Sequence, residues 1–144
     1  MRPLLLAAIA ALAVAAPALA ADPVEGDWLV QNHEARIRIG PCPTLPEDLC
    51  GVIDWLRAPT DAAGAPKRDV HNPNPALRSR PLMGLTLIWD FRRDAAGRWG
   101  EGKIYDPKSG KTYDSKLDLN SDGTLKVSGC VLMFCQTQTW KRVS

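Results

Sequence analysis

Histidine is scarce in this chain of 144 residues, and its scarcity limits the chemistry that the sequence supports. His33 and His71 are the only two, and they fall in a predicted turn and a predicted loop. No G-x-S-x-G motif is present, so a Ser-His-Asp hydrolase site lacks its usual signature. The two histidines also lack the spacing of metal-binding pairs. We therefore expect surface histidines, no enzyme activity, no metal site and no cofactor.

A strong excess of charge of one sign is also missing. The chain has 18 Lys and Arg residues against 16 Asp and Glu, for a formal net charge of +2. Proteins that bind nucleic acids or anionic membranes through bulk charge carry a clear basic excess. The composition therefore gives no reason to expect either partner, and we expect no nucleic-acid binding.

The stretch Gly110-Lys111-Thr112 is spelled like the end of a phosphate-binding loop, but the rest of that motif is missing. The motif G-x-x-x-x-G-K-[ST] requires a glycine five residues before Gly110, and that position holds Tyr105. A strand-like alternation follows Thr112, in place of the helix whose N-terminus would hold phosphate. The stretch is predicted to be a hairpin turn, in which Pro107 fixes φ and Gly110 supplies a left-handed conformation.

Only one long apolar run is present, and it lies at the N-terminus. Residues 4–14 are uninterrupted Leu, Ala, Ile and Val, and Ala18-Leu19-Ala20 places small residues where a signal peptidase reads. This pattern predicts a signal peptide over residues 1–20, cleaved after Ala20, and a periplasmic or secreted protein with one domain over residues 21–144. The alternative is a membrane anchor, but the run is short for a membrane span. The residue directly after the cut is Ala21 and not a cysteine that could carry a lipid.

Four cysteines follow the predicted signal peptide: Cys42, Cys50, Cys130 and Cys135. An even number in an exported domain indicates disulfides, and three pairings are possible. We favour Cys42–Cys50 and Cys130–Cys135 because the partners are close in sequence, and each short loop contributes about 2–3 kcal/mol in the chain-entropy model. Zinc is the alternative, but neither C-x7-C nor C-x4-C has the spacing typical of zinc sites.

Alternation of apolar and polar residues with a period of two dominates the rest of the chain. Asp, Asn, Pro and Gly residues typical of turns separate the alternating segments, and no long segment has a good helical stripe. The sequence therefore predicts strands joined mostly by hairpins. They are Gly26–Gln31, Ala35–Ile39, Leu49–Arg57, Leu85–Arg92, Arg98–Tyr105, Lys111–Leu119, Thr124–Gly129 and Thr137–Val143.

The segment Ala58–Pro81 interrupts this pattern with five prolines and few large apolar residues. It is predicted to be a long loop, and such loops in compact domains are often functional or otherwise mobile. Asn72 precedes a proline and is therefore held extended. Arg78 and Arg80 are candidates to bind a carboxylate or phosphate group of a ligand. The alternative is that they pair with acidic residues of the loop itself.

Aromatic residues in or beside the strands are the other candidates for a binding site: Trp55, Trp89, Trp99, Tyr105 and Tyr113. Facing a barrel interior, they would line a small-molecule site. The alternative is that they fill the core. A barrel of eight strands is wide enough either to be filled by side chains or to hold one ligand.

Several segments that occur in order give the chain a family resemblance. They are Gly26-Asp27-Trp28, Leu49-Cys50-Gly51-Val52-Ile53-Asp54-Trp55-Leu56, Asn72-Pro73, Arg78, Arg80-Pro81-Leu82-Met83-Gly84, Trp99 to Pro107, Gly110-Lys111-Thr112-Tyr113, Gly129-Cys130 and Thr139-Trp140-Lys141-Arg142-Val143. Together they resemble the bacterial family named domain of unknown function 2147. The usual glycine pair before the lysine reads Glu101-Gly102 here. The resemblance implies an exported, lipocalin-like β-barrel and leaves the activity open.

We therefore predict an all-β protein, a single antiparallel eight-stranded lipocalin-like (calycin-like) barrel with one long Pro-rich loop. The favoured function is binding of a small apolar or amphipathic ligand in the barrel mouth. Its candidate residues are Trp55, Trp89, Tyr105, Tyr113, Asn72, Arg78 and Arg80. The alternative is a non-enzymatic periplasmic protein-interaction module with a filled barrel and a working surface at residues 58–81.

A last expectation concerns how the barrel closes. Lipocalin-like barrels often carry G-x-W in the first strand and a basic residue near the end of the last strand, and Trp28 and Arg142 fit that pattern. The first and last strands are neighbours in a closed barrel. We expect Trp28 to plug one end of the barrel, with the guanidinium of Arg142 across its indole. Lys141 should point to the opposite face, because side chains alternate along a strand.

Overall fold

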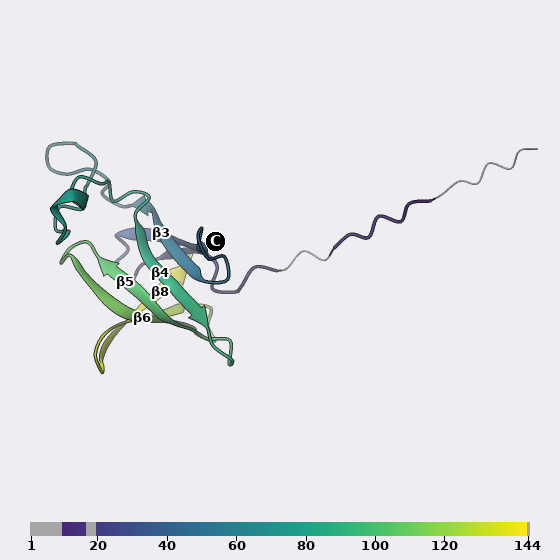
Figure 1. The fold of residues 1–144 in the computed structure, drawn as a ribbon. Coiled ribbons are helices and arrows are strands. Elements are labelled where there is room, and N and C mark those ends of the chain that lie inside the picture. Colours follow the sequence, from purple (N-terminus) through teal and green to yellow (C-terminus); the bar gives the residue numbers. More distant parts are fainter. Residues whose placement is uncertain (1–9, 17–19, 144) are drawn as a thin grey trace, which may run out of the picture.

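The computed structural model describes residues 10–16 and 20–143 (Figure 1). The predicted signal peptide lies partly outside the described residues, since 1–9 and 17–19 are not among them. Within the described part of the chain, no helix has the length and apolar character needed to cross a membrane.

Eight antiparallel strands form a closed barrel in which every strand pairs with its neighbours in the chain and β8 returns to β1. The strands are β1 (Gly26–Leu29), β2 (Ala35–Pro41), β3 (Leu49–Leu56), β4 (Thr86–Arg93), β5 (Trp99–Asp106), β6 (Lys111–Leu119), β7 (Leu125–Val131) and β8 (Phe134–Arg142). The predicted fold class is confirmed. The largest difference lies in β8, which begins at Phe134 rather than at Thr137.

The early start of β8 follows from a cross-link at the tip of the last hairpin. Cys130 and Cys135 are directly opposite each other in the ladder between β7 and β8 and form a disulfide. The pairing therefore continues to Val131 and Phe134. Cys42 and Cys50 form the other disulfide, so both predicted pairs are confirmed.

One end of the barrel is closed by Trp28, whose side chain is completely buried. The guanidinium carbon of Arg142 lies 4.2 Å from the centroid of the Trp28 ring. Arg142 also donates hydrogen bonds to the backbone carbonyl oxygens of Glu25, at 3.1 Å, and Pro23. The predicted contact between Trp28 and Arg142 is confirmed, and we refer to this end as the closed end.

Arg142→Ala is expected to lower the free energy of unfolding by about 2 kcal/mol, because the indole loses its cation and two carbonyl groups lose a charged donor. The matched control is Lys141→Ala, one residue away and exposed, with an expected loss below about 0.5 kcal/mol. Urea denaturation followed by tryptophan fluorescence measures both. Equal losses for the two variants would contradict this account of the closed end.

Three strands of the described part depart from simple alternation, and in two of them, β3 and β4, the departure moves a tryptophan outward. Between β2 and β3 the register passes from Ile37↔Ile53 to Arg36↔Trp55, so the intervening Asp54 has no partner in this ladder. This bulge turns Trp55 outward, where its side chain is 39% exposed. Trp55, a candidate for the barrel interior, therefore lies on the outer face of the barrel.

The second departure lies in β4, where two register shifts separate Thr86 from Phe91 in the pairing with β3. Ile88 and Phe91 are completely buried, and Asp90 between them takes a positive φ of 59°. The predicted inward face included Trp89, but Ile88 occupies that place. Trp89 is only partly buried and packs against the edge of the core.

The long segment between β3 and β4 is an ordered loop with a short 3-10 helix, η1 (Pro75–Leu77). It folds back on itself through hydrogen bonds from Lys67 to Pro59 and from Leu82 to Lys67 along the backbone. Figure 1 shows it at the end of the barrel away from the N-terminal segment. The predicted long Pro-rich loop is confirmed.

Candidate functional site

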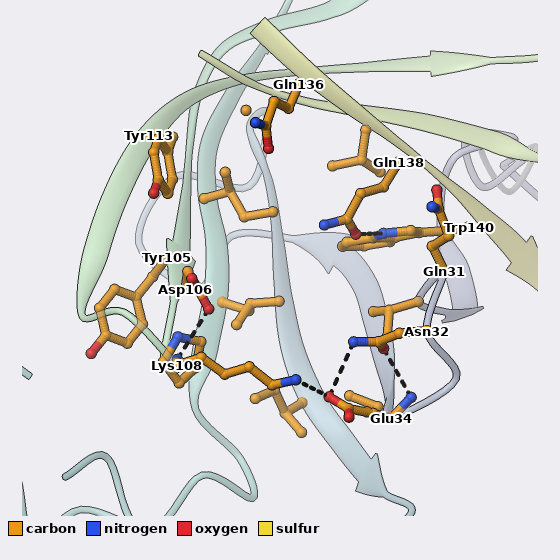
Figure 2. A pocket seen from close by; sticks show the side chains of 18 of the residues that line it. Gln31, Asn32, Glu34, Tyr105, Asp106, Lys108, Tyr113, Gln136, Gln138 and Trp140 are labelled. Carbon is orange, nitrogen blue, oxygen red and sulfur yellow. Dashed lines mark hydrogen bonds and ion pairs between the residues drawn. The ribbon is translucent and has the colours of Figure 1, made fainter. Parts of the chain in front are cut away.

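The barrel holds a cavity of about 1000 Å³ at the end opposite to Trp28 (Figure 2). Residues from the β1–β2 turn, the end of β3, the β5–β6 turn and the β7–β8 hairpin line it. The half of the barrel near the closed end is filled by large side chains such as Phe91 and Leu117. The fold therefore provides one filled half and one open half.

The floor of the cavity is apolar. Trp140, Val127, Ile53 and Leu87 line it, and each of these side chains is buried. The indole Nε1 of Trp140 donates a hydrogen bond to Oε1 of Gln138 at 2.9 Å, which satisfies the ring's polar atom. Trp140 thus presents an apolar ring to the cavity without leaving a donor unpaired.

One wall of the cavity is polar and comes from β8. Gln136 and Gln138 alternate in phase with Trp140, and Figure 2 shows both amides on the same side of the strand as the indole. This wall is open on its outer side because β1 ends at Leu29. Among the described residues, the pairs between β1 and β8 are Trp28↔Arg142 and Leu29↔Lys141. The carboxamide of Gln31 fills part of this opening by accepting a hydrogen bond from the Thr139 backbone at 2.8 Å.

The open end of the cavity, which we call the mouth, carries charged side chains from three connections. Glu34 of the β1–β2 turn and Lys108 of the β5–β6 turn form an ion pair at 2.5 Å. Arg57 and Lys67 also line the mouth. The pKa of the Glu34 carboxyl is lowered, mainly by the hydrogen bond from Lys108. Burial opposes this as the second-largest effect, and the positive charges of Lys108, Arg57 and Lys67 each lower the pKa by a smaller amount. The mouth therefore surrounds one carboxylate with three cations.

A buried carboxylate fixes the long loop beside the mouth. Asp69 is completely buried, and its Oδ1 accepts a hydrogen bond from the Tyr105 hydroxyl at 2.6 Å. Its Oδ2 accepts from Asn72 Nδ2 at 2.8 Å and from Arg80 Nε at 2.9 Å. Arg80 also lies 5.8 Å from the centroid of the Tyr105 ring. One carboxylate thus joins three residues of the loop to β5.

This network changes the titration of both buried groups. Burial alone raises the pKa of Asp69, but the hydrogen bonds from Tyr105, Asn72 and Arg80 outweigh it, so the pKa of this carboxyl is lowered. Burial and the adjacent Asp69 carboxylate raise the pKa of Tyr105 to about 12. Asp69 is therefore ionised and Tyr105 neutral at neutral pH, which is the pairing that the hydrogen bond requires.

The model of the family described as "Uncharacterized protein conserved in bacteria (DUF2147)" matches residues 26–142. The chain belongs to this family. The DUF2147 chain is also similar to a solved structure, protein HP1028 from the human pathogen Helicobacter pylori, which is described as belonging to the lipocalin family. The two are 24% identical with a TM-score of 0.71, over 84% of this chain and 83% of that chain.

At this level of identity the similarity to HP1028 shows the fold alone. No curated protein matches the sequence. The two disulfides and the bacterial family of the DUF2147 chain are compatible with an exported protein.

The structure brings together some of the residues that the sequence singled out. Tyr105 and Tyr113 line the cavity of the DUF2147 chain, whereas Trp55 and Trp89 do not. Asn72, Arg78 and Arg80 also lie outside the lining and hold the loop: Arg80 pairs with Asp69, and Arg78 Nε donates to the Asn72 carbonyl oxygen at 2.8 Å. Both arginines therefore contact residues of the loop itself, which agrees with the alternative stated above for them. His33 and His71 are exposed, as expected.

Several lining residues were missed by the sequence reasoning: Glu34, Lys108, Gln136 and Gln138. The two glutamines carried a usable signal, since they alternate in phase with Trp140. The predicted last strand began at Thr137, which cut this pattern short. Glu34 and Lys108 lie in separate turns, and nothing in their local sequence indicates that they meet. In the part of the DUF2147 chain that the structure describes, no group of three or more His, Cys, Asp or Glu is placed to hold a metal ion.

Proposed function

We propose that this DUF2147 chain is an exported protein that binds one small apolar or amphipathic ligand in the open half of its barrel. The observation that carries the proposal is the cavity of about 1000 Å³. Ligand pockets commonly measure about 300–1000 Å³, with apolar walls and a few polar groups that fix orientation. A filled barrel, which the interaction-module alternative requires, would have no such space.

The lining supports a ligand with an apolar body and a polar end. Trp140, Ile53 and Leu87 offer apolar contact at the floor, and burial of ligand surface there contributes roughly 25 cal/mol per Å². Gln136 and Gln138 offer amide donors and acceptors along one wall. In this arrangement the apolar body lies against the floor and the polar end faces β8 and the mouth.

The ion pair between Glu34 and Lys108 spans part of the mouth. They come from different turns and face each other across the rim of the cavity. An exposed ion pair of this kind contributes about 1 kcal/mol or less, so it can open at little cost when a ligand enters. A ligand with an anionic end would gain Lys108 as a partner in place of Glu34.

Gly129→Phe tests the proposal by filling the cavity from inside. Gly129 lines the cavity, and the atoms nearest to a Cβ added there belong to Tyr113 and Ile104, at ordinary contact distances of 3.7 Å or more. The phenyl ring then occupies ligand space. We expect saturable binding of the apolar fluorophore N-phenyl-1-naphthylamine to the wild type, with a stoichiometry near one. In the variant, affinity should fall by about tenfold or more, which corresponds to about 1.4 kcal/mol.

The matched control is Gly40→Phe. Gly40 also lies in a strand, but a Cβ added there has no atom within 4 Å, and the residue does not line the cavity. Its affinity for the fluorophore should stay at the wild-type value. Absence of saturable binding to the wild type, or an equal loss in both variants, would argue against a binding site in the barrel.

A further inference from the structure

The hairpin between β7 and β8 ends in four consecutive large apolar residues: Val131, Leu132, Met133 and Phe134. Their exposed fractions are 55%, 90%, 86% and 78%. We call these four residues the apolar tip. Figure 1 shows this hairpin, in olive to yellow, projecting beyond the body of the barrel. Scattered exposed apolar residues are ordinary, but a contiguous exposed group indicates a contact surface.

The apolar tip differs from every other hairpin turn between β4 and β8. The β4–β5, β5–β6 and β6–β7 turns are polar, and each contains a glycine with positive φ, namely Gly97, Gly110 and Gly123. In the apolar tip the left-handed position is occupied by Leu132, with a φ of 55°. A leucine is unfavourable there, since glycine and asparagine adopt this conformation more readily. Four exposed apolar side chains lower solubility, and leucine disfavours the turn conformation at position 132. Neither property explains why apolar residues occupy this turn.

The tip is also held rigidly at its base. Cys130 and Cys135 form a disulfide across the hairpin one residue before and one residue after the four apolar residues. An isolated two-stranded extension is marginal in water without such a constraint. The cross-link therefore keeps the four side chains presented together instead of letting them fold back onto the barrel.

The apolar tip lies beside the mouth and shares residues with it. Val131 and Phe134 belong to the apolar tip and also line the cavity. The mouth residues Arg57, Lys67 and Lys108 line the same cavity. Lys108 pairs with Glu34, whereas within the described residues neither Arg57 nor Lys67 forms a salt bridge. The open end of the barrel thus combines a projecting apolar turn with cations that lack a fixed partner.

We propose that the apolar tip inserts into a phospholipid bilayer, so that the mouth of the barrel faces the membrane surface. Leu132, Met133 and Phe134 enter the boundary between headgroups and acyl chains, where apolar side chains are favoured. Arg57 and Lys67 then meet anionic headgroups, an attraction that is local and does not need a large net charge. The proposal does not depend on a ligand in the cavity.

The shape of the surface favours a bilayer over a protein partner. The four side chains sit on a narrow, convex turn, and a standard protein interface buries about 800 Å² on each partner, more than such a turn offers. A fluid bilayer closes around a projection without a complementary groove. A second copy of this chain is the competing occupant, because the outer edge of β8 lacks a strand partner over its first residues within the described part of the chain.

The test compares vesicle binding by the oxidised protein, purified after export, and by a tip variant. Vesicles of phosphatidylcholine, and of phosphatidylethanolamine with phosphatidylglycerol, are sedimented with the protein, and the bound fraction is measured. We expect the wild type to bind both kinds, with tighter binding to the anionic vesicles. The double substitution Leu132→Asn with Met133→Ser should lower the partition coefficient by about tenfold or more. Asparagine suits the φ of residue 132, so the melting temperature should be kept or raised.

The matched control is Leu45→Asn, an exposed leucine in the β2–β3 loop that does not line the cavity. It should bind vesicles as the wild type does, and all variants should still bind N-phenyl-1-naphthylamine, which separates this proposal from the proposed function. Wild-type protein that binds neither kind of vesicle would overturn it, as would a tip variant that binds as tightly as the wild type. A dimer in sedimentation equilibrium that the tip variant abolishes, without vesicle binding, would assign the tip to a second copy instead.

Discussion

Replacing Asp69 with alanine is expected to lower the free energy of unfolding by about 3 kcal/mol or more. The substitution leaves the Tyr105 hydroxyl, the Asn72 amide and the Arg80 guanidinium without their shared acceptor. Tyr105 and Asn72 are buried, so water cannot replace the carboxylate without opening the loop. Urea denaturation followed by circular dichroism measures the loss.

The matched control is Asp61→Ala in the same loop. Asp61 is exposed, and its carboxylate accepts hydrogen bonds only from the backbone amides of Ala63 and Ala65 among the hydrogen bonds of the described residues. Its loss should cost about 1 kcal/mol or less. Similar losses for the two variants would mean that the Asp69 network does not anchor the loop.

The same network makes stability depend on pH in two windows. The folded-state pKa of Asp69 is lowered, so its contribution is complete above the unfolded value of about 3.9 and is lost as pH falls through the folded pKa. The pKa of Tyr105 is raised to about 12, so its contribution is complete below the unfolded value of about 10 and is lost as pH rises from there through about 12. In Asp69→Asn the free energy of unfolding should depend less on pH in the acid range. In Tyr105→Phe it should depend less on pH in the alkaline range.

Gly110→Ala is the second substitution with a large expected effect, a loss of about 3 kcal/mol in the free energy of unfolding. Gly110 has a φ of +71°, and a Cβ added there would lie 2.0 Å from the backbone oxygen of His71. That oxygen belongs to the long loop and cannot rotate away as a side chain would. The loop must therefore move away from the β5–β6 turn, which also strains the contacts of Asp69.

Gly123→Ala separates the cost of the positive φ from the cost of the steric clash with the loop. Gly123 occupies the β6–β7 turn with a φ of +84°, but a Cβ added there meets no atom within 4 Å. It carries the backbone strain alone, at a cost of about 1 kcal/mol. Thermal and urea unfolding of the two variants should differ by about 2 kcal/mol. Equal losses would show that the loop does not pack on Gly110 in solution.

Gly110 also shows how a sequence motif can have a purely structural cause. The spelling Gly110-Lys111-Thr112 matches the end of a phosphate loop, but the structure uses the glycine for a left-handed turn under a neighbouring backbone. The predicted hairpin turn is confirmed. Glycine is also required at position 110 because the backbone of His71 packs against it. This second requirement comes from a segment distant in sequence, so the residues around Gly110 could not have indicated it.

The fold was largely predictable because alternation and turn residues mark the strands one by one. The orientation of individual side chains was less so. A bulge adds a single residue and reverses the alternation beyond it. Trp55 and Trp89 both lie just beyond such a shift, and neither has a glycine directly beside it; the glycine at the β3–β4 shifts, Gly51, lies on the strand opposite Trp89.

The candidate site was predictable only where it follows from strand phase. Tyr113 was found because it alternates with exposed neighbours in a well-marked strand, and Tyr105 because it is an aromatic residue at the end of a predicted strand. The pair of Glu34 and Lys108 joins two turns that meet only after the barrel has closed. Arg80 could have been assigned to a ligand or to the loop from its charge alone, and its contact with the buried Asp69 depends on how the loop folds back.

The short pairing between β1 and β8 bears on how long the folded state survives. Every other ladder of the barrel joins neighbours in the chain, and all of these except the β3–β4 ladder, which closes the long loop, can form with little loss of loop entropy. The ladder between β1 and β8 joins the two ends of the domain through Trp28↔Arg142 and Leu29↔Lys141. Such a seam closes late in folding and opens early in unfolding, so contacts across it act on the unfolding rate more than on the folding rate. The stacking of Arg142 on Trp28 therefore slows unfolding. Its removal should raise the unfolding rate and shorten the lifetime of the folded barrel, while the rate at which the hairpins form stays the same.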